Sequence, residues 1–318
     1  MAGHGLSAGE MFMGIGFYST CSLGMLLFNK MAIVSFPLEC TLVGLQMLFA
    51  VICMLVCYPT LHFGSIRDVL RWSIVAPFFT GMLLTSILAL KHAPMSMVVV
   101  FRVLSALLAL AIERFYPDPL RVDWWTMLSI LFMLVGSALY AWDMPTHNLI
   151  TGLPWIFANM LFAVADRLLQ RMMLAKEQRP VDISLTGVTL ISNFWGFVIL
   201  IFFAWLKNEF AEISMVSSLS GLQIFFIVGS CIVGTGISFS GIWVQRLISA
   251  TSFLVLVNMN KFGIIFIEAF IMGTKSLTSL QMFGACVAIA AGILYGQARK
   301  SLEQSEAAVK QIEAQLSK

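Results

Sequence analysis

The sequence predicts an all-α integral membrane protein, with ten transmembrane helices arranged as two inverted five-helix repeats. The composition indicates the class, because 59% of the 318 residues are hydrophobic and only 11% are charged. Soluble domains carry about 25% charged residues. The apolar runs extend over about 20 residues, as membrane-spanning helices do, whereas a barrel strand needs only about 10 alternating ones. A water-soluble domain is therefore excluded.

Ten apolar segments, joined by short connections, predict the transmembrane helices. In chain order they are Met11–Val34, Leu38–Tyr58, Trp72–Leu90, Ala93–Ile112, Trp124–Trp142, Leu149–Met173, Ser184–Leu206, Gly221–Gln245, Ser249–Met272 and Leu277–Gln297. The connections carry the expected prolines, among them Pro37, Pro59, Pro117, Pro119, Pro145 and Pro180. Tryptophans near the segment ends predict an interfacial aromatic belt, made of Trp72, Trp124, Trp125, Trp142, Trp155 and Trp205.

The distribution of basic residues predicts that both termini face the cytosol. No basic region or small-residue cleavage site precedes the first apolar segment, so we expect an uncleaved anchor rather than a signal peptide. Only Lys91, Lys207 and Lys275 lie in the connections on the opposite side. The cytosolic side would hold twelve basic residues, Arg67, Arg71, Arg114, Arg121, Arg171, Lys176, Arg179, Arg246, Arg299, Lys300, Lys310 and Lys318. This asymmetry follows the positive-inside rule.

An internal alignment supports the inverted repeats. Residues 91–115 align with residues 246–270, which places Glu113 opposite Glu268 and Arg102 one helical turn from the position of Lys261. An odd number of spans in each half makes the halves enter the membrane from opposite sides. We therefore predict a first repeat over residues 1–146, a second over 147–297, and a partly helical cytosolic tail over 298–318.

Polar residues in the ninth segment predict a solute pathway. A charged side chain at membrane depth costs roughly 2.5–3.5 kcal/mol, so Lys261 and Glu268 need a partner charge, a cavity or an ionic ligand. We interpret Lys261 and Arg102 as cations that bind an anion near the midplane. The alternative is that the amides only bond neighbouring helices and that Lys30 extends to the interface.

Other chemistries find little support in the sequence. No arrangement of residues suggests catalysis or a metal site, so we expect no enzyme activity and no cofactor, and we expect no nucleic-acid partner. Asp166 and Arg167 favour a structural ion pair over a proton relay. Gly292 and Gly296 favour close helix packing, with a homodimer contact as the alternative.

The eighth and ninth segments resemble the nucleotide-sugar transporters of the drug/metabolite transporter superfamily, and most of all the Golgi GDP-mannose transporters. The run Val257-Asn258-Met259-Asn260-Lys261 takes the place of that group's Gly-Ala-Leu-Asn-Lys motif. Ser238 and Phe253 keep the family's spacing to this motif. Val257 and Asn258 replace a small Gly-Ala pair that lets a base approach the backbone.

Three further segments extend the resemblance to about 290 residues. Tyr18 precedes Asn29-Lys30 by eleven residues, as a family tyrosine precedes its own Asn-Lys. Ile191-Ser192-Asn193-Phe194 matches the family's Phe-Tyr-Asn-Asn motif only at its first Asn, so one sugar-facing Asn is lost. Phe101-Arg102 replaces a Phe-Lys pair.

The resemblance implies a secondary antiporter of the Golgi membrane. It would carry a nucleotide sugar from cytosol to lumen in exchange for GMP, and the first-choice substrate is GDP-mannose or another GDP-sugar. Lys261 and Arg102 would bind the phosphates. Asn193 and Tyr18 would contact sugar and ribose, and Asn258, Asn260 and Ser238 the base. The full set of expected binding residues is Tyr18, Asn29, Lys30, Arg102, Ser192, Asn193, Ser238, Phe253, Val257, Asn258, Asn260 and Lys261.

Two alternatives stay open. A triose-phosphate or other organic-phosphate translocator would typically place an Arg directly after the ninth-segment Lys, where this chain has Phe262. A membrane enzyme or scaffold would be expected to show a catalytic arrangement or an extended lumenal loop.

Overall fold

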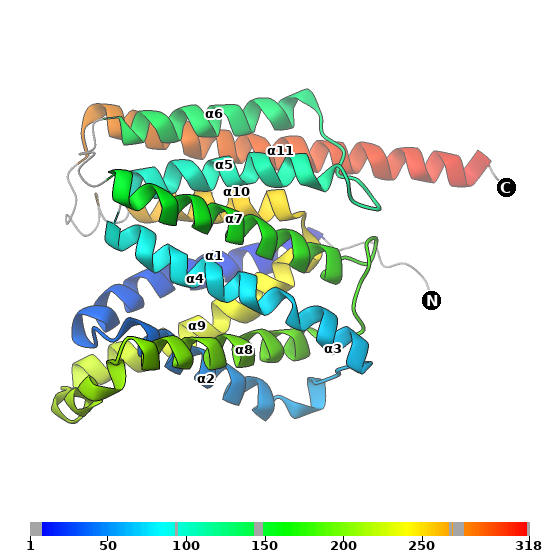
Figure 1. Ribbon diagram of the computed structural model, residues 1–318. Coiled ribbons are helices and arrows are strands. Elements are labelled where there is room, and N and C mark those ends of the chain that lie inside the picture. Colours follow the sequence, from blue (N-terminus) through cyan, green and yellow to red (C-terminus); the bar gives the residue numbers. More distant parts are fainter. Residues whose placement is uncertain (1–7, 93–94, 143–148, 267–268, 270–276, 317–318) are drawn as a thin grey trace. The chain divides into compact units, whose positions relative to one another are not determined.

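The structure is a computed structural model that describes residues 8–92, 95–142, 149–266, 269 and 277–316. Every extended regular element within these ranges is a helix (Figure 1). The helices are α1 (Ala8–Ser35), α2 (Glu39–Val56), η1 (Tyr58–Thr60), α3 (Ile66–Ser73), α4 (Val75–His92), α5 (Met95–Glu113), α6 (Trp124–Ala141), α7 (Leu149–Leu174), α8 (Leu185–Leu206), η2 (Glu209–Ser218), α9 (Gly221–Leu247), α10 (Ala250–Phe266) and α11 (Ser279–Leu316). Glu268, Lys275 and the side chain of Lys30 lie outside the described part.

Eight of the described helical segments are long and apolar enough to cross a membrane. They are Gly9–Ile33, Glu39–Val56, Ile66–Ser86, Trp124–Ala141, Thr151–Leu174, Leu185–Leu206, Gly221–Leu247 and Ser279–Leu302. The all-helical class agrees with an integral membrane protein. The predicted fourth and ninth spans are also helices, α5 and α10, but they are not among the eight, so the total of ten stays a prediction.

The third predicted span begins earlier than the sequence suggested. The helix starts at Ile66 rather than Trp72, after Ser65 has capped it by accepting a hydrogen bond from the backbone N–H of Asp68. It is divided into α3 and α4 at Ile74. Pro77 explains the division, because proline lacks the N–H that would bond to the carbonyl of Ser73.

The chain forms two compact units, each built from two stretches of sequence. Unit 1 comprises Met1–Leu84 and Ala165–Ser249, and unit 2 comprises Thr85–Val164 and Ala250–Lys318. The chain therefore passes between the units three times, within α4, within α7 and between α9 and α10. Each unit combines segments of both predicted repeats, and the repeat boundary at residues 146 and 147 stays a prediction.

Trp72 anchors an apolar core in unit 1, where α3 packs on α8. Its side chain is fully buried, and its indole N–H lies 3.1 Å from the carbonyl oxygen of Val188 and 2.9 Å from Oγ of Ser192. The prediction that Trp72 belongs to an interfacial belt was wrong, because the indole finds its hydrogen-bond partners inside the protein. The other belt candidates are between 38% and 77% exposed.

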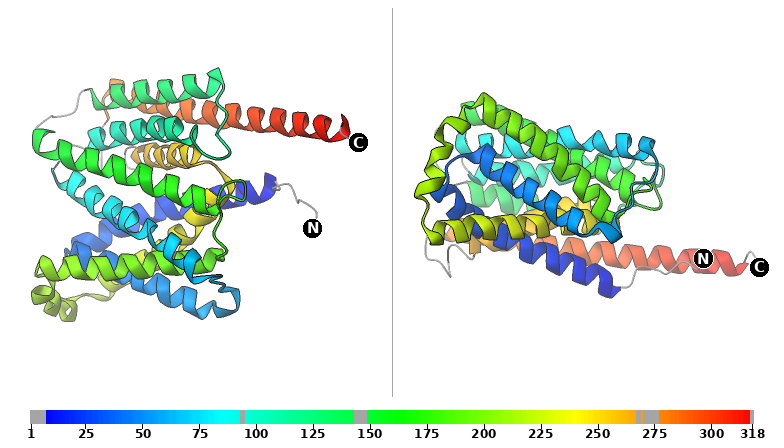
Figure 2. Two further views of the ribbon diagram at one scale, coloured as in Figure 1. Left: turned by 45° about the vertical axis from the view of Figure 1, so that its right-hand side comes forward. Right: turned by 90° about the horizontal axis from the view of Figure 1, so that it is seen from below.

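In unit 2, α6 and α11 lie side by side at very short range (Figures 1 and 2). A Cβ atom on Gly284 would lie 2.5 Å from the backbone nitrogen of Tyr140 and 2.6 Å from the carbonyl oxygen of Gly136. Only glycine permits this approach of two backbones. Gly292 also packs tightly, against the side chain of Met259 on α10.

Helix α11 continues well beyond its membrane segment. Its apolar part is Ser279–Leu302, and the helix runs on to Leu316. The predicted tail over residues 298–318 is therefore helical as far as the structure describes it, and Figure 2 shows it as a straight extension of the helix.

Replacing Gly284 with Ala should lower the thermal stability of the protein. The new methyl group would meet backbone atoms, and overpacking of this kind costs about 1–3 kcal/mol. The melting temperature in detergent micelles measures the effect. Gly296→Ala on the same helix is the matched control, since nothing lies within 4 Å of its Cβ position, and it should be neutral or stabilising. Equal melting temperatures for the two variants would contradict the close packing of α6 and α11.

Candidate functional site

In unit 1, an amide of α8 and a hydroxyl of α9 come together. Nδ2 of Asn193 donates to the carbonyl oxygen of Thr189 and to Oγ of Ser238, both at 2.7 Å. Both amide protons are thereby used, so Asn193 can offer its Oδ1 as an acceptor, while the Ser238 hydroxyl keeps its proton to donate. The neighbouring Ser192 instead faces Trp72 and accepts the indole hydrogen bond.

Helix α1 places two of the expected residues in different environments. Tyr18 is buried, at 5% exposure, and Asn29 is half-buried. Oδ1 of Asn29 accepts from Nε2 of Gln46 at 2.7 Å, and the same nitrogen lies 3.0 Å from Oγ of Ser230. Gln46 was not expected from the sequence. The sequence feature that could have indicated its role is the single amide side chain among the mostly apolar residues of α2.

In unit 2, α5 and α10 bring two cations together. Nη2 of Arg102 donates to Oγ of Ser86 at 2.8 Å, and its carbonyl oxygen accepts from Nδ2 of Asn258 at 3.0 Å. Lys261 is half-buried and follows Asn258 by three residues, so it lies on the face of α10 whose amide contacts the Arg102 backbone on α5. No carboxylate in the described ranges forms an ion pair with Lys261. The prediction that Arg102 and Lys261 bind one anion stays a prediction.

Two amide atoms beside these cations have no hydrogen-bond partner among the described residues. They are Oδ1 of Asn258 and Nδ2 of Asn260, and both are buried. An unpaired buried amide costs about 1–3 kcal/mol, so such atoms mark a place for a polar ligand. Val257 is half-buried on the same helix, and Phe253 has no exposed surface.

No protein-family model matches the chain. GDP-fucose transporter 1 of Arabidopsis thaliana is 27% identical over 299 residues, which cover 89% of this chain and 84% of the relative. GDP-mannose transporter GONST3 of the same plant is 26% identical over 280 residues, with 85% and 73% covered. The curated homologues of this chain are nucleotide-sugar transporters. The resemblance drawn from the sequence motifs is confirmed.

A solved crystal structure shares the fold. It is 13% identical in sequence, covers 90% of this chain and 95% of its own, and superposes with a TM-score of 0.62. At this identity the likeness concerns the fold alone. The chain therefore has nucleotide-sugar transporters among its homologues and a known helical fold.

A buried carboxylate fixes the start of α10, the helix that carries Asn260 and Lys261. Glu113, at the end of α5, accepts hydrogen bonds from the backbone N–H groups of Ala250 and Thr251 at 2.9 and 3.0 Å. It also accepts the Thr251 hydroxyl at 2.5 Å. A carboxylate at a helix N-terminus satisfies unpaired N–H groups and interacts favourably with the helix dipole. Glu113 therefore positions α10, and it is not one of the expected binding residues.

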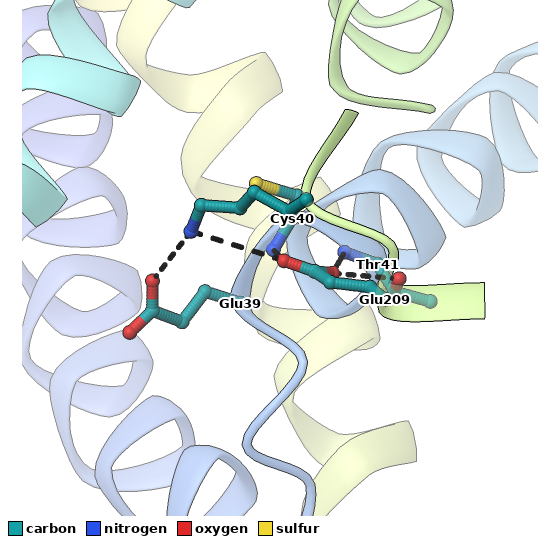
Figure 3. A network of polar contacts seen from close by, with 5 residues as sticks. Glu39, Cys40, Thr41 and Glu209 are labelled. Atoms are coloured by element: carbon teal, nitrogen blue, oxygen red, sulfur yellow. Dashed lines mark hydrogen bonds and ion pairs between the residues drawn. The ribbon is translucent and has the colours of Figure 1, made fainter. Parts of the chain in front are cut away.

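Unit 1 contains the same device at the start of α2 (Figure 3). Glu209 accepts from the backbone N–H groups of Cys40 and Thr41, at 3.2 and 2.8 Å, and from the Thr41 hydroxyl at 2.8 Å. Lys207 lies 3.2 Å from Oε2 of Glu39 and 3.9 Å from Oε1 of Glu209. Burial lowers the pKa of the Lys207 ammonium, but the hydrogen bond to Glu39 and the surrounding negative charges outweigh it, so the pKa is raised. The ion pair is therefore present at neutral pH and is lost only as strongly alkaline pH deprotonates the lysine.

Substituting Glu113 with Ala should destabilise unit 2. Two buried N–H groups at the start of α10 would lose their acceptor, which costs about 1–3 kcal/mol. The shift in melting temperature measures this loss. The exposed Glu212 provides the control, since Glu212→Ala removes the same charge and volume from a solvated position. If Glu113→Ala were as stable as the control, the hydrogen bonds of Glu113 would not contribute to the stability of the fold.

Proposed function

We propose that this protein is a secondary antiporter that exchanges a cytosolic GDP-sugar for lumenal GMP across a Golgi or related membrane. The observation that carries the proposal is the packing of α5, which carries Arg102, on α10, which carries Lys261 and the unpartnered amide atoms of Asn258 and Asn260. The homologues are named for GDP-fucose and GDP-mannose, and these names support GDP as the nucleotide part of the substrate.

The phosphates of the ligand would relieve the repulsion between the cations. Two like charges in an apolar environment raise each other's energy, and a diphosphate neutralises both while accepting their hydrogen bonds. Arg102 suits phosphate because its planar guanidinium presents several donors, and Lys261 acts as a compact point charge. We assign the diphosphate of the GDP-sugar to these two residues.

The unpartnered amide oxygen of Asn258 suits the edge of a guanine base. Guanine presents N–H donors at N1 and N2, which need an acceptor. Oδ1 of Asn258 offers one on the helix face of Lys261, three residues on, whereas Asn260 lies two residues after Asn258 and so presents its Nδ2 on another face of α10. The hydroxyl of Ser238, with Oδ1 of Asn193, offers a donor and an acceptor of the kind that sugar hydroxyls bind.

The positive charge of the proposed site favours exchange over one-way transport. The Lys261 ammonium has no carboxylate partner among the described residues, and such a charge is costly to move through the membrane unless an anion accompanies it. Inverted repeats that rock around a midplane site would therefore move only with a nucleotide bound, in either direction. The monophosphate left after sugar transfer carries the phosphate and base needed to drive the return step.

Lys261→Ala should abolish most of the exchange of labelled GDP-mannose or GDP-fucose against GMP in proteoliposomes. The loss of one charge-assisted contact, about 1.5–3 kcal/mol, weakens the apparent affinity roughly 10- to 150-fold. The variant should keep its melting temperature, because the removed charge repels Arg102. Lys207→Ala, which removes an ammonium from an ion pair at a helix end, should exchange within about twofold of wild type. Unchanged exchange by Lys261→Ala would contradict the phosphate role.

A thermal-shift panel should distinguish the class of ligand. GMP, GDP-mannose and GDP-fucose should each raise the melting temperature, since a ligand at 100 times its Kd adds about 2.7 kcal/mol of stability. UMP should raise it less, because uracil does not present the guanine edge. Stabilisation by 3-phosphoglycerate without stabilisation by GMP would point to an organic-phosphate translocator instead.

A further inference from the structure

A buried polar network on α7 has no part in the proposed nucleotide site. Asp166 is fully buried, and its Oδ2 lies 3.4 Å from Nε of Arg167, which is the ion pair expected from the sequence. Oδ1 of Asp166 accepts from Nε2 of Gln170 at 2.8 Å. These residues lie in unit 1, directly after the point where α7 enters that unit.

Arg167 connects this network to two other helices. Its Nη1 lies 3.3 Å from Oε1 of Gln245 on α9 and 3.5 Å from Oε1 of Gln170. Its Nη2 lies 4.0 Å from the sulfur of Met82 on α4. Gln245 is fully buried, and its Nε2 has no partner in the part of the chain that the structure describes.

Arg171, one turn further along α7, holds the end of α9. Its Nη1 donates to the carbonyl oxygens of Gln245 and Arg246, both at 3.1 Å, and its guanidinium pairs with Glu177. A cation near the last carbonyls of a helix meets the negative end of the helix dipole. We refer to Asp166, Arg167, Gln170, Arg171 and Gln245 as the α7–α9 network.

The network contacts all three segments through which the chain passes between the units. The chain leaves unit 1 after Leu84, re-enters it after Val164 and leaves it again after Ser249, and we call these points the crossings. Met82 lies two residues before the first crossing, Asp166 two residues after the second, and Arg246 three residues before the third. One set of hydrogen bonds thus ties together the unit 1 ends of α4, α7 and α9.

Stability alone does not account for such a network. Buried ion pairs can often be replaced by apolar residues without loss of stability, and this one leaves a buried amide nitrogen unpartnered among the described residues. Polar groups of this kind can instead specify one geometry. We propose that the α7–α9 network is a positioning device that makes the three crossing segments move with unit 1 as one body, and that Arg167 is its central residue.

The proposal rests on the proposed exchange function, because rigid-body motion has a purpose only if the protein alternates between two states. Loss of the network would leave the nucleotide-binding residues in place, since none of the five belongs to that set. It would instead let the helix ends move independently, so that less of the binding energy drives the transition. The exchange rate should therefore fall, while the affinity for nucleotide stays the same.

The test compares Arg167→Met and the double variant Asp166→Leu/Arg167→Met with wild type in three measurements. We expect the double variant to melt within a few degrees of wild type, because the ion pair is removed as a whole. GMP affinity, from the thermal shift, should change less than about twofold, and the maximal exchange rate should fall at least tenfold. Hydrogen exchange of the backbone amides near Gln245 should become faster. Arg167→Lys should restore part of the rate.

Arg71→Met is the matched control, because Arg71 also donates to a backbone carbonyl, that of Arg179 at 2.9 Å, and pairs with Asp68 at 3.6 Å away from the crossings. It should leave the exchange rate within about twofold of wild type. Wild-type exchange by the double variant would overturn the inference, and so would a joint loss of affinity and melting temperature. A wild-type protein that neither binds nor exchanges GMP would overturn the proposed function instead, and the hydrogen-exchange comparison would still decide whether the network holds α9.

Discussion

The free-energy cost of a charge in an apolar helical protein organises this structure. A charged or amide group placed among membrane helices needs a counter-charge or a hydrogen-bond partner nearby. Most of the described polar groups have one: Arg167 meets Asp166 and Gln245, and Lys207 meets Glu39. Lys261 differs, because no carboxylate in the described part of the chain pairs with it. Under the proposed function, this contrast separates groups that maintain the fold from the group that binds a ligand.

Both units use a distant carboxylate to fix the beginning of a helix. Glu113 binds the first N–H groups of α10, and Glu209 binds those of α2, each with a threonine hydroxyl as the third donor. The carboxylate comes from a different helix or loop, so each cap is a tertiary contact as well as a local one. In α10 this places Asn258 and Lys261 on a fixed axis.

The helical class and most helix bounds could be predicted from the sequence, because an apolar run long enough to span a membrane forms a helix in nearly every case. The alignment of the fourth and ninth segments also set Arg102 and Lys261 one helical turn apart on corresponding helices, and these helices, α5 and α10, do pack together. It placed the third span too late and assigned Trp72 to the interface, because hydropathy does not show where a capping serine or an interior hydrogen bond lies. Gln46 and Glu113 were missed as anchors for the same reason. Their partners, Ser230 and Thr251, are distant in sequence, and a single chain carries no sign of such pairs.

The length of α11 has a practical consequence for experiments on sidedness. At 1.5 Å per residue the part after Leu302 would extend about 21 Å, more than half the thickness of the hydrocarbon core of a bilayer. A fluorophore or epitope attached near Leu316 would stand clear of the lipid headgroups and of the packed helices of unit 2. Such a label would report which aqueous compartment holds the C-terminus while leaving the α6–α11 glycine contact undisturbed.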